Sequence, residues 1–383
     1  MASRSIDRCR DYAREERVLR VVWVVPGFSS DENDWCIPAL LDLARTISPS
    51  CDLHIVAMRY PYRRDTYTIG KAIVHSIGGG HRGPSHTPGI WRDAARVVRG
   101  LRCDVLHAFW AYEPGLIAAW FAKQFPAIIS LAGGELTFLP EIRYGLMGRK
   151  RTRIPLRWAL RRVPVVTAGS RFLLDLAHRA IPHITPKFVP LGVDLKRWPS
   201  RSRNAGPLTI LNVGSLEPVK GQDVLLRSVS RVLHRSPSAR LRIAGGGREL
   251  GRLVSLAHQL GIAQSVEFAG PVAHYELPAW YCGATLFAQS SWHEAQGMAL
   301  LEAAACGLPI AGTAVGALPE FAPAAALQVP VGDEDGLAAV LLRILENRDE
   351  AECLGVKARD RVEAGYKVET TAERFLELYR SLM

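Results

Sequence analysis

Short apolar runs alternate with longer amphipathic stretches along almost the whole chain of 383 residues, and this pattern constrains the fold most. The runs are rich in Val, Ile and Leu, and helical periodicity appears between them, as in residues 223–233 and 250–260. Alternating strand and helix signals predict an α/β fold with parallel sheets and helices on both faces. The expected strands are 19–25, 53–58, 104–109, 127–131, 163–168, 208–213, 241–244, 266–268, 285–288 and 309–312.

The alternation is interrupted at residues 198–207, a polar stretch with Pro and Gly and without an apolar period. Such a stretch is typical of an interdomain linker. We therefore predict two Rossmann-like, doubly wound domains, residues 1–200 and 205–366, that face each other across a cleft. A C-terminal helix in residues 367–383 is expected to pack back on the N-terminal domain. Ligands of such sheets bind at the carboxyl ends of the strands.

The net charge of +11 indicates an anionic partner, which could be nucleotide phosphate, nucleic acid or an acidic membrane surface. A run of eighteen apolar residues is absent, and the charged N-terminus through Arg17 makes a poor signal peptide. We therefore expect a cytoplasmic chain. Its seven cysteines contain no C-x-x-C pair, so reduced thiols are expected, without a zinc site or disulfide framework.

Residues 290–312 contain two glutamates around the start of a predicted helix that begins near Gln296 and ends at Cys306-Gly307. Glu294 precedes this helix and Glu302 lies inside it. The free N–H groups of Gln296, Gly297 and Met298 would form an anion site, and Gly297 lets a ligand approach the backbone closely. This arrangement suits a sugar diphosphate.

Each glutamate also has an alternative interpretation. An acid just before a helix, like Glu294, is often only a cap that complements the helix dipole. Glu302 lies in an apolar stretch, where a carboxylate without a partner would cost several kcal/mol. It therefore reaches solvent or has a dedicated polar partner.

The glutamate segment resembles the signature of the family 4 glycosyltransferases, which have the GT-B fold. In that signature two Glu residues are separated by seven others, Gly follows the first by three, and an Ala-rich helix leads to Cys-Gly-Leu-Pro. The resemblance covers roughly residues 19 to 380. Its motifs here are Glu294, Gly297, Glu302, Cys306-Gly307-Leu308-Pro309, the phosphate-loop-like 212–221, the strand-end turn 243–247, and the stretches 190–194 and 315–320.

The resemblance implies a retaining glycosyltransferase that moves a sugar from a nucleotide diphosphate sugar to a hydroxyl acceptor, with no cofactor and no metal. The N-terminal domain would face the acceptor and the C-terminal domain would bind the donor. Glu294 would hold sugar hydroxyls and Glu302 the ribose. Lys220 would neutralise the diphosphate, whose charge grows as the glycosidic bond breaks. Gly214 and Gly245 would form the strand-end turns of the donor site.

The chain departs from the family pattern at several positions. Ser215 stands where the family usually has Arg, and a hydroxyl brings no charge to the diphosphate. Ala132 stands where the family often has His, and Glu135 in the same loop is a candidate for the polar contact. Gly27 is the only glycine of a first turn that is glycine-rich in the family. His107 is a candidate acceptor contact or, alternatively, a structural histidine.

Residues 143–162 carry eight Lys or Arg and no acid, with Ile154 and Trp158 among the cations. Such a segment predicts peripheral contact with an anionic membrane at the inner membrane face, and a solvated cationic helix is the alternative. Two further functions stay open at this stage: a nucleotide-sugar epimerase of the same fold, and a non-catalytic basic binding protein. No nucleic-acid motif is recognised, so we expect no nucleic-acid partner.

Overall fold

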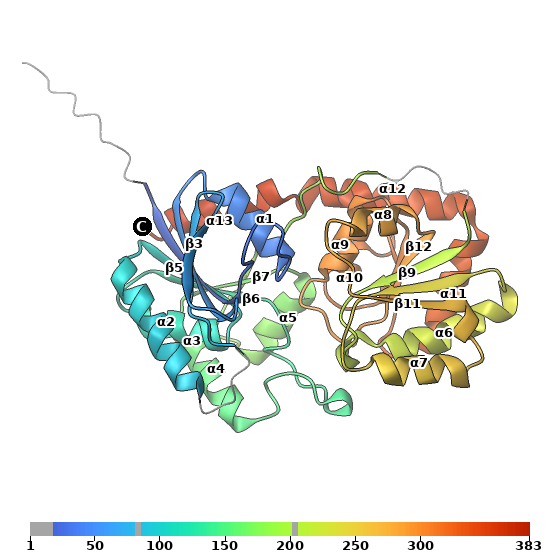
Figure 1. The fold of residues 1–383 in the computed structure, drawn as a ribbon, viewed down its shortest axis with the longest axis horizontal. Helices are drawn as coiled ribbons and strands as arrows, with labels where there is room; N and C mark the ends of the chain where they lie inside the picture. The colour runs from blue at the N-terminus through green and yellow to red at the C-terminus, as the bar shows by residue number, and fades with distance from the viewer. Residues whose placement is uncertain (1–17, 81–85, 201–205) are drawn as a thin grey trace, which may run out of the picture.

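The computed structural model describes residues 18–80, 86–200 and 206–383. The charged N-terminal stretch and residues 201–205 of the expected linker lie outside them. Two sheets form separate halves of the molecule (Figure 1). The chain crosses between them after Val189, which is in the N-terminal core, and before Val193, which is in the C-terminal core, and helices of the C-terminal end cross back. Each half is an α/β domain of Rossmann-like type, as the alternating pattern predicts.

The sheet of the N-terminal domain has the strand order β3-β4-β2-β1-β5-β6-β7-β8. Neighbouring strands are parallel except β3 and β4, which form an antiparallel hairpin. The strands are β1 (Arg20–Gly27), β2 (Asp52–Tyr60), β3 (Asp65–Ile69), β4 (Ala72–Ser76), β5 (Val105–Phe109), β6 (Ala127–Leu131), β7 (Val165–Ala168) and β8 (Lys187–Phe188). β1 and β5 are buried apart from Arg20 and Pro26 of β1, because helices cover both faces of the sheet.

The helices of this domain separate two apolar cores. Helices α2 (Thr87–Leu101), α3 (Glu113–Phe121) and α4 (Lys150–Arg162) supply one core, and α1 (Pro38–Ile47) supplies the other. α5 (Arg171–Ala180) follows β7, and a 3-10 turn, η2 (Pro140–Ile142), precedes α4. Helix α13 (Val368–Arg380) comes from the C-terminal end of the chain and packs beside α1.

The sheet of the C-terminal domain is parallel throughout, with the order β11-β10-β9-β12-β13-β14. Its strands are β9 (Thr209–Val213), β10 (Arg240–Ala244), β11 (Val266–Gly270), β12 (Leu286–Gln289), β13 (Ile310–Thr313) and β14 (Leu327–Val329). Its helices are α6 (Gln222–Arg235), α7 (Leu250–Gln259), α8 (Leu277–Cys282), α9 (Met298–Ala305), α10 (Leu318–Phe321), α11 (Glu334–Glu346) and α12 (Arg348–Gly365), with 3-10 turns η3 (Pro218–Lys220) and η4 (Ala263–Ser265). α6, α7 and α11 cover one face, and α8, α9, α10 and α12 cover the other. No helix in the described part of the chain is long and apolar enough to span a membrane.

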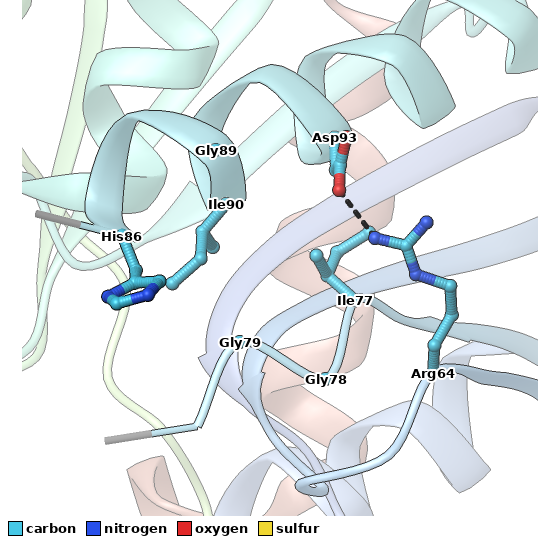
Figure 2. Close-up of a pocket in the computed structure, with 8 residues that line it drawn as sticks. All are labelled: Arg64, Ile77, Gly78, Gly79, His86, Gly89, Ile90 and Asp93. Carbon is cyan, nitrogen blue, oxygen red and sulfur yellow. Dashed lines mark hydrogen bonds and ion pairs between the residues drawn. The ribbon is translucent and has the colours of Figure 1, made fainter. Parts of the chain in front are cut away.

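Gly78 and Gly79 after β4 line a hollow of about 280 Å³ against α2. Figure 2 shows Gly78 and Gly79 facing His86, Gly89 and Ile90 of the segment that starts α2. A side-chain carbon at Gly79 would lie 2.6 Å from the Met58 carbonyl oxygen, so the backbone passes too close to β2 for any other residue. Arg64 and Asp93 form an ion pair at one side of the hollow, and Asp93 balances the positive charge of Arg64.

Candidate active site

Lys220 and Glu294 are 74 residues apart in the chain and form an ion pair in the C-terminal domain. Lys220 Nζ lies 2.6 Å from Glu294 Oε1, and the Ser291 hydroxyl donates to the same oxygen at 2.7 Å. The Lys220 side chain is 27% exposed and the Glu294 side chain 13%. The second oxygen, Oε2, accepts no hydrogen bond from the described residues. The pair is therefore reachable from solvent, with one acceptor available for a ligand hydroxyl.

Two loops hold this ion pair in place. Lys220 ends η3 in the loop after β9, and the Ser290 hydroxyl donates to its carbonyl at 2.9 Å. Trp292 N donates to the Val219 carbonyl at 2.8 Å. Gly221 has φ +60°, and a side-chain carbon there would lie 2.2 Å from the Ser290 carbonyl oxygen. Glycine at 221 therefore lets the two loops touch, and this contact brings the lysine to the glutamate.

Helix α9 begins at Met298, two residues later than expected, with Gly297 at φ +93° in front of it. The Gly297 carbonyl accepts from Leu300 N and Leu301 N, which leaves the N–H groups of Met298 and Ala299 without a partner inside the helix. Gln296 lies outside the helix. Both atoms of its side-chain amide bond the backbone of Leu191, with Leu191 N to Oε1 at 2.9 Å and Nε2 to the Leu191 carbonyl at 2.6 Å. Its side chain thus joins the two domains.

The loops at the carboxyl ends of β9, β10 and β11 pack directly on one another. Gly214 N donates to the Ala244 carbonyl at 3.0 Å, and Gly245 N donates to the Gly270 carbonyl at 2.8 Å. A side-chain carbon at Gly245, where φ is +145°, would lie 1.9 Å from the Gly214 carbonyl oxygen. Ser215 is exposed, and its carbonyl accepts from Gln222 Nε2 at 3.1 Å. The predicted turn residues therefore lie together beside the lysine.

Glu302 is buried and accepts a hydrogen bond at each carboxylate oxygen. His274 Nε2 lies 2.9 Å from Oε1, and the Tyr281 hydroxyl donates to Oε2 at 2.9 Å. The dedicated polar partner that the apolar setting requires is thus present. Burial and Glu302 together raise the pKa of Tyr281 well above its ordinary value, so this hydroxyl stays a donor.

A chain of contacts connects Glu302 to the N-terminal domain. The Arg197 guanidinium donates to His274 Nδ1 at 2.8 Å and to Asp42 Oδ1, on α1, at 2.6 Å. Because arginine is only a donor, Nδ1 is the acceptor and the histidine carries its proton on Nε2, toward Glu302. Asp42 is buried, which raises its pKa, and Arg197 opposes that shift. The sequence carries no signal that links residues 42, 197, 274 and 302.

The N-terminal domain touches the loop of Glu294 directly. His293 Nε2 lies 3.2 Å from the Gly133 carbonyl, and the Ser170 hydroxyl donates to the Ala295 carbonyl at 2.6 Å. The His293 ring lies between Tyr144 and Phe172, with ring centres 5.8 and 5.6 Å away. Burial lowers the pKa of His293, so it is neutral at pH 7 and donates from Nε2. Burial, Glu294 and Glu135 raise the pKa of Tyr144 to about 12. Sequence reasoning missed Tyr144.

His107 and Glu135, the two candidate contacts to the acceptor or the sugar, are both buried. His107 has no exposed surface, and its ring nitrogens lie 2.7 Å from the Tyr379 and Ser130 hydroxyls. Burial lowers its pKa to about 3, and the expectation that it contacts an acceptor is corrected: it is a structural histidine. The Glu135 carboxylate, also buried, accepts from the backbone N–H groups of Ala111, Ala132 and Gly133, so it organises the loop in which Ala132 lies.

Gly27, the candidate from the first turn, is buried at the end of β1, where a side-chain carbon would lie 3.1 Å from Tyr60 Cβ. It therefore has a packing role between β1 and β2. The described residues contain no group of three or more His, Cys, Asp or Glu side chains placed to hold a metal ion. The described cysteines are free thiols.

Comparison with known proteins covers both domains. Residues 39–197 match the family described as Glycosyltransferase Family 4, and residues 196–361 match the family described as Glycosyl transferases group 1. A GDP-mannose-dependent alpha-(1-6)-phosphatidylinositol monomannoside mannosyltransferase of Mycobacterium tuberculosis is 31% identical over 295 residues, 70% of this chain and 77% of that protein. A D-inositol 3-phosphate glycosyltransferase of Frankia alni is 34% identical over 317 residues, 72% of this chain and 77% of that protein.

Solved structures agree on the fold. Sucrose-phosphate synthase from Thermosynechococcus elongatus superposes with a TM-score of 0.80 at 18% identity, over 95% of this chain and 99% of that one. The Anabaena protein HepE in complex with UDP-glucose superposes with a TM-score of 0.75 at 16% identity, over 95% of this chain and 100% of that one. With the matched families and relatives, these findings exclude a purely non-catalytic binding protein. The chain belongs to the family 4 glycosyltransferases and is a glycosyltransferase with the GT-B fold.

Proposed function

We propose that the protein transfers a sugar from a nucleoside diphosphate sugar to a hydroxyl group, with retention of the anomeric configuration and without a bound metal. The observation that carries the proposal is the ion pair between Lys220 and Glu294 beside the start of α9. A cation, a carboxylate with a free oxygen and unpaired N–H groups are the groups that a sugar diphosphate requires.

Each group has a distinct role in the proposed reaction. Glu294 accepts hydrogen bonds from donor-sugar hydroxyls through Oε2. Lys220 and the N–H groups of Gln296, Gly297 and Met298 stabilise the diphosphate charge that develops as the glycosidic bond breaks. The departing phosphate oxygen removes the proton of the acceptor hydroxyl on the same face of the sugar. Glu302 holds the ribose, with His274 and Tyr281 fixing its orientation.

The first donors to test are GDP-mannose and then UDP-glucose. Relatives that match about three quarters of this chain are named GDP-mannose-dependent mannosyltransferases, including one from Corynebacterium glutamicum that is 29% identical over 77% of the chain. The HepE complexes contain UDP and UDP-glucose. The names of the sequence relatives include a phosphatidylinositol mannoside and inositol 3-phosphate, so polyol acceptors with an anionic or lipid group are the first choice. Residues 143–162 would bring the enzyme to a lipid-linked acceptor by peripheral contact with an anionic membrane.

The test measures nucleotide release from GDP-mannose or UDP-glucose by the wild type and by Lys220→Ala and Glu294→Ala. Both variants should lose about 10² to 10³ in rate, because each lacks a group that the transition state uses. Arg343→Ala removes a surface ion pair between α11 and Glu350 of α12 and should keep wild-type turnover. Circular dichroism checks that each variant is folded. Near-normal turnover in both site variants would overturn the assignment, and conversion of the donor sugar without an acceptor would favour an epimerase.

A further inference from the structure

An apolar groove of about 750 Å³ lies between α2, α3 and α4 on the N-terminal domain. Figure 1 shows these three helices on the same side of the sheet, and α3 packs against both of the others. A groove of this volume is within the range of small-molecule sites, roughly 300–1,000 Å³. Its apolar lining includes Trp91, Trp120, Ile154 and Trp158. The groove shares no lining residue with the candidate active site.

The apolar side chains of the groove are unusually exposed. Trp120 and Ile154 are each 64% exposed and Trp158 is 41% exposed. Ile154 and Trp158 are four residues apart on α4, so they project from the same side of that helix. Large apolar side chains clustered on a surface indicate a binding partner, because leaving them in water is unfavourable.

The helices around the groove are strongly cationic. α4 carries six Lys or Arg residues and no acid, and none of them forms an ion pair within the described part of the chain. α2 adds Arg92, Arg96 and Arg99, which line the groove from one face. The acids of α2 and α3 are Asp93 and Glu113, and Glu113 pairs with Arg59. Asp93 pairs with Arg64, with Arg96 at 3.1 Å and with Arg92 at 4.0 Å, so this one carboxylate faces three arginines. The rim is therefore positive with few counter-charges.

An apolar groove with a cationic rim fits an amphiphile that has a long apolar chain and an anionic head. A second copy of this chain fits poorly, because two such faces would bring their excess positive charges together. Arginine binds phosphate oxygens through paired N–H groups, and tryptophan is favoured at the boundary between lipid headgroups and acyl chains.

We infer that this groove binds one acyl chain of an anionic phospholipid of the bilayer, while Arg92, Arg96 and Arg99 bind its phosphate. The inference rests on the proposed membrane contact of residues 143–162. It extends that contact from this one segment to the surface formed by α2, α3 and α4. The segment before α4 carries Tyr144, whose ring contacts His293 next to Glu294, so the chain itself connects the groove to the candidate active site.

The test is flotation of the full chain with vesicles of phosphatidylcholine alone and with about 30 mol % phosphatidylglycerol. The wild type should float only with the anionic vesicles. The double variant Trp120→Ser/Ile154→Ser should lose about tenfold or more in vesicle affinity, because the groove loses two apolar side chains that would contact the acyl chain. Both residues are largely exposed, so the variant should fold. Val356→Ser removes a side chain of 57% exposure from α12 and should bind as the wild type does.

A second pair of measurements distinguishes binding of the lipid headgroup from nonspecific electrostatic attraction between the cationic protein and an anionic membrane. Arg92→Gln/Arg99→Gln should weaken flotation at every salt concentration, and soluble short-chain phosphatidylglycerol should compete with vesicles for the wild type but not for Trp120→Ser/Ile154→Ser. Equal flotation with both vesicle types, or unchanged flotation of the groove variant, would overturn the inference. So would light scattering that shows a dimer dissolved by the groove substitutions, because the occupant would then be a second copy.

The outcomes also distinguish this inference from the proposed function. The groove variant should keep the wild-type rate of nucleotide release with a water-soluble acceptor or with water. A wild type that floats but releases no nucleotide would contradict the proposed function and leave the groove assignment intact. A groove variant that floats normally but fails only with lipid-linked acceptors would identify the occupant as the acceptor and overturn the bilayer assignment.

Discussion

Glu302 shows at the scale of one residue how a buried charge is accommodated. It lies on a helix whose other residues are apolar, and His274 and Tyr281 each donate to one of its oxygens. Removing a carboxylate from such a site leaves two buried donors without an acceptor, and unpaired buried polar groups are costly. The first effect of losing Glu302 is therefore expected on the fold, before any effect on the donor.

We predict that Glu302→Ala lowers the free energy of unfolding by about 3–5 kcal/mol, measured by urea denaturation. Tyr281→Phe should lower it by about 1.5–3 kcal/mol, because one hydrogen bond to a charged group is lost. Glu363→Ala, which removes an exposed pair with Arg359 on α12, should change it by less than about 1 kcal/mol. Equal small effects for all three would mean that the carboxylate of Glu302 is hydrated.

The loops at the ends of β9 and β10 show how an element sets the geometry of the candidate site. Gly245 and Gly214 touch through their backbones, and the loop of Gly214 leads directly to Lys220. The position of the lysine thus depends on a contact in which no side chain takes part. Sequence reasoning placed both glycines in turns, but it did not predict that the two turns touch.

We predict that Gly245→Ala lowers both stability and nucleotide release, because the added carbon would overlap the Gly214 carbonyl and displace its loop. The free energy of unfolding should fall by about 1–3 kcal/mol. Gly251→Ala is the matched control: it lies in α7 with no atom within 4 Å of the added carbon, and it should raise stability by about 0.5–1 kcal/mol. If Gly245→Ala behaves like this control, the loops of Gly214 and Gly245 can move apart to accommodate the added carbon without loss of stability.

Two helices at the C-terminal end of the chain, α12 and α13, pack on different domains and so hold the whole molecule together. α12 covers the C-terminal sheet, and α13 inserts Phe375 and Tyr379 into the core of the N-terminal domain, where Trp23 Nε1 donates to the Tyr379 hydroxyl at 3.0 Å. Arg197 and Gln296 add contacts between the domains at the site. The last residues of the chain therefore contribute to the fold of the first domain.

Buried histidines should make the stability of the whole molecule depend on pH. Burial lowers the pKa of His54, His75, His107 and His293 below their ordinary value of 6.5. The unfolded chain then binds protons that the folded chain does not, so stability is fully present above about pH 6.5 and is lost as the pH falls. His107 alone should contribute up to about 1.4 kcal/mol per pH unit below that value.

Urea unfolding between pH 7.5 and 5 checks this prediction, since carboxylates titrate mostly below that window. The midpoint should fall with pH in the wild type and fall less steeply in His107→Gln, which cannot gain a proton. A wild-type midpoint that is flat or rises toward pH 5 would show that these histidines are protonated in the folded protein.

Much of the fold could be predicted from the sequence because strand and helix periodicity are local properties. The ten expected strands correspond to β1, β2, β5, β6, β7, β9, β10, β11, β12 and β13. β3, β4, β8 and β14 were missed: β3, β8 and β14 lie at sheet edges, β4 forms a hairpin with the edge strand β3, and β8 has only two residues, too few to show a period. The glutamate segment and the family resemblance were readable for the same reason, since their residues are close together in the chain.

The sequence by itself determined the two sheets, the family and the pair of glutamates, because hydrophobic periodicity and a contiguous motif are written in neighbouring residues. Only the tertiary structure decided that Glu302 is held by His274 and Tyr281, that His107 is in the core and that three helices form the groove. These features join residues far apart in the chain. Burial and hydrogen bonding act between whatever side chains packing brings together, and one sequence does not record which segments those are.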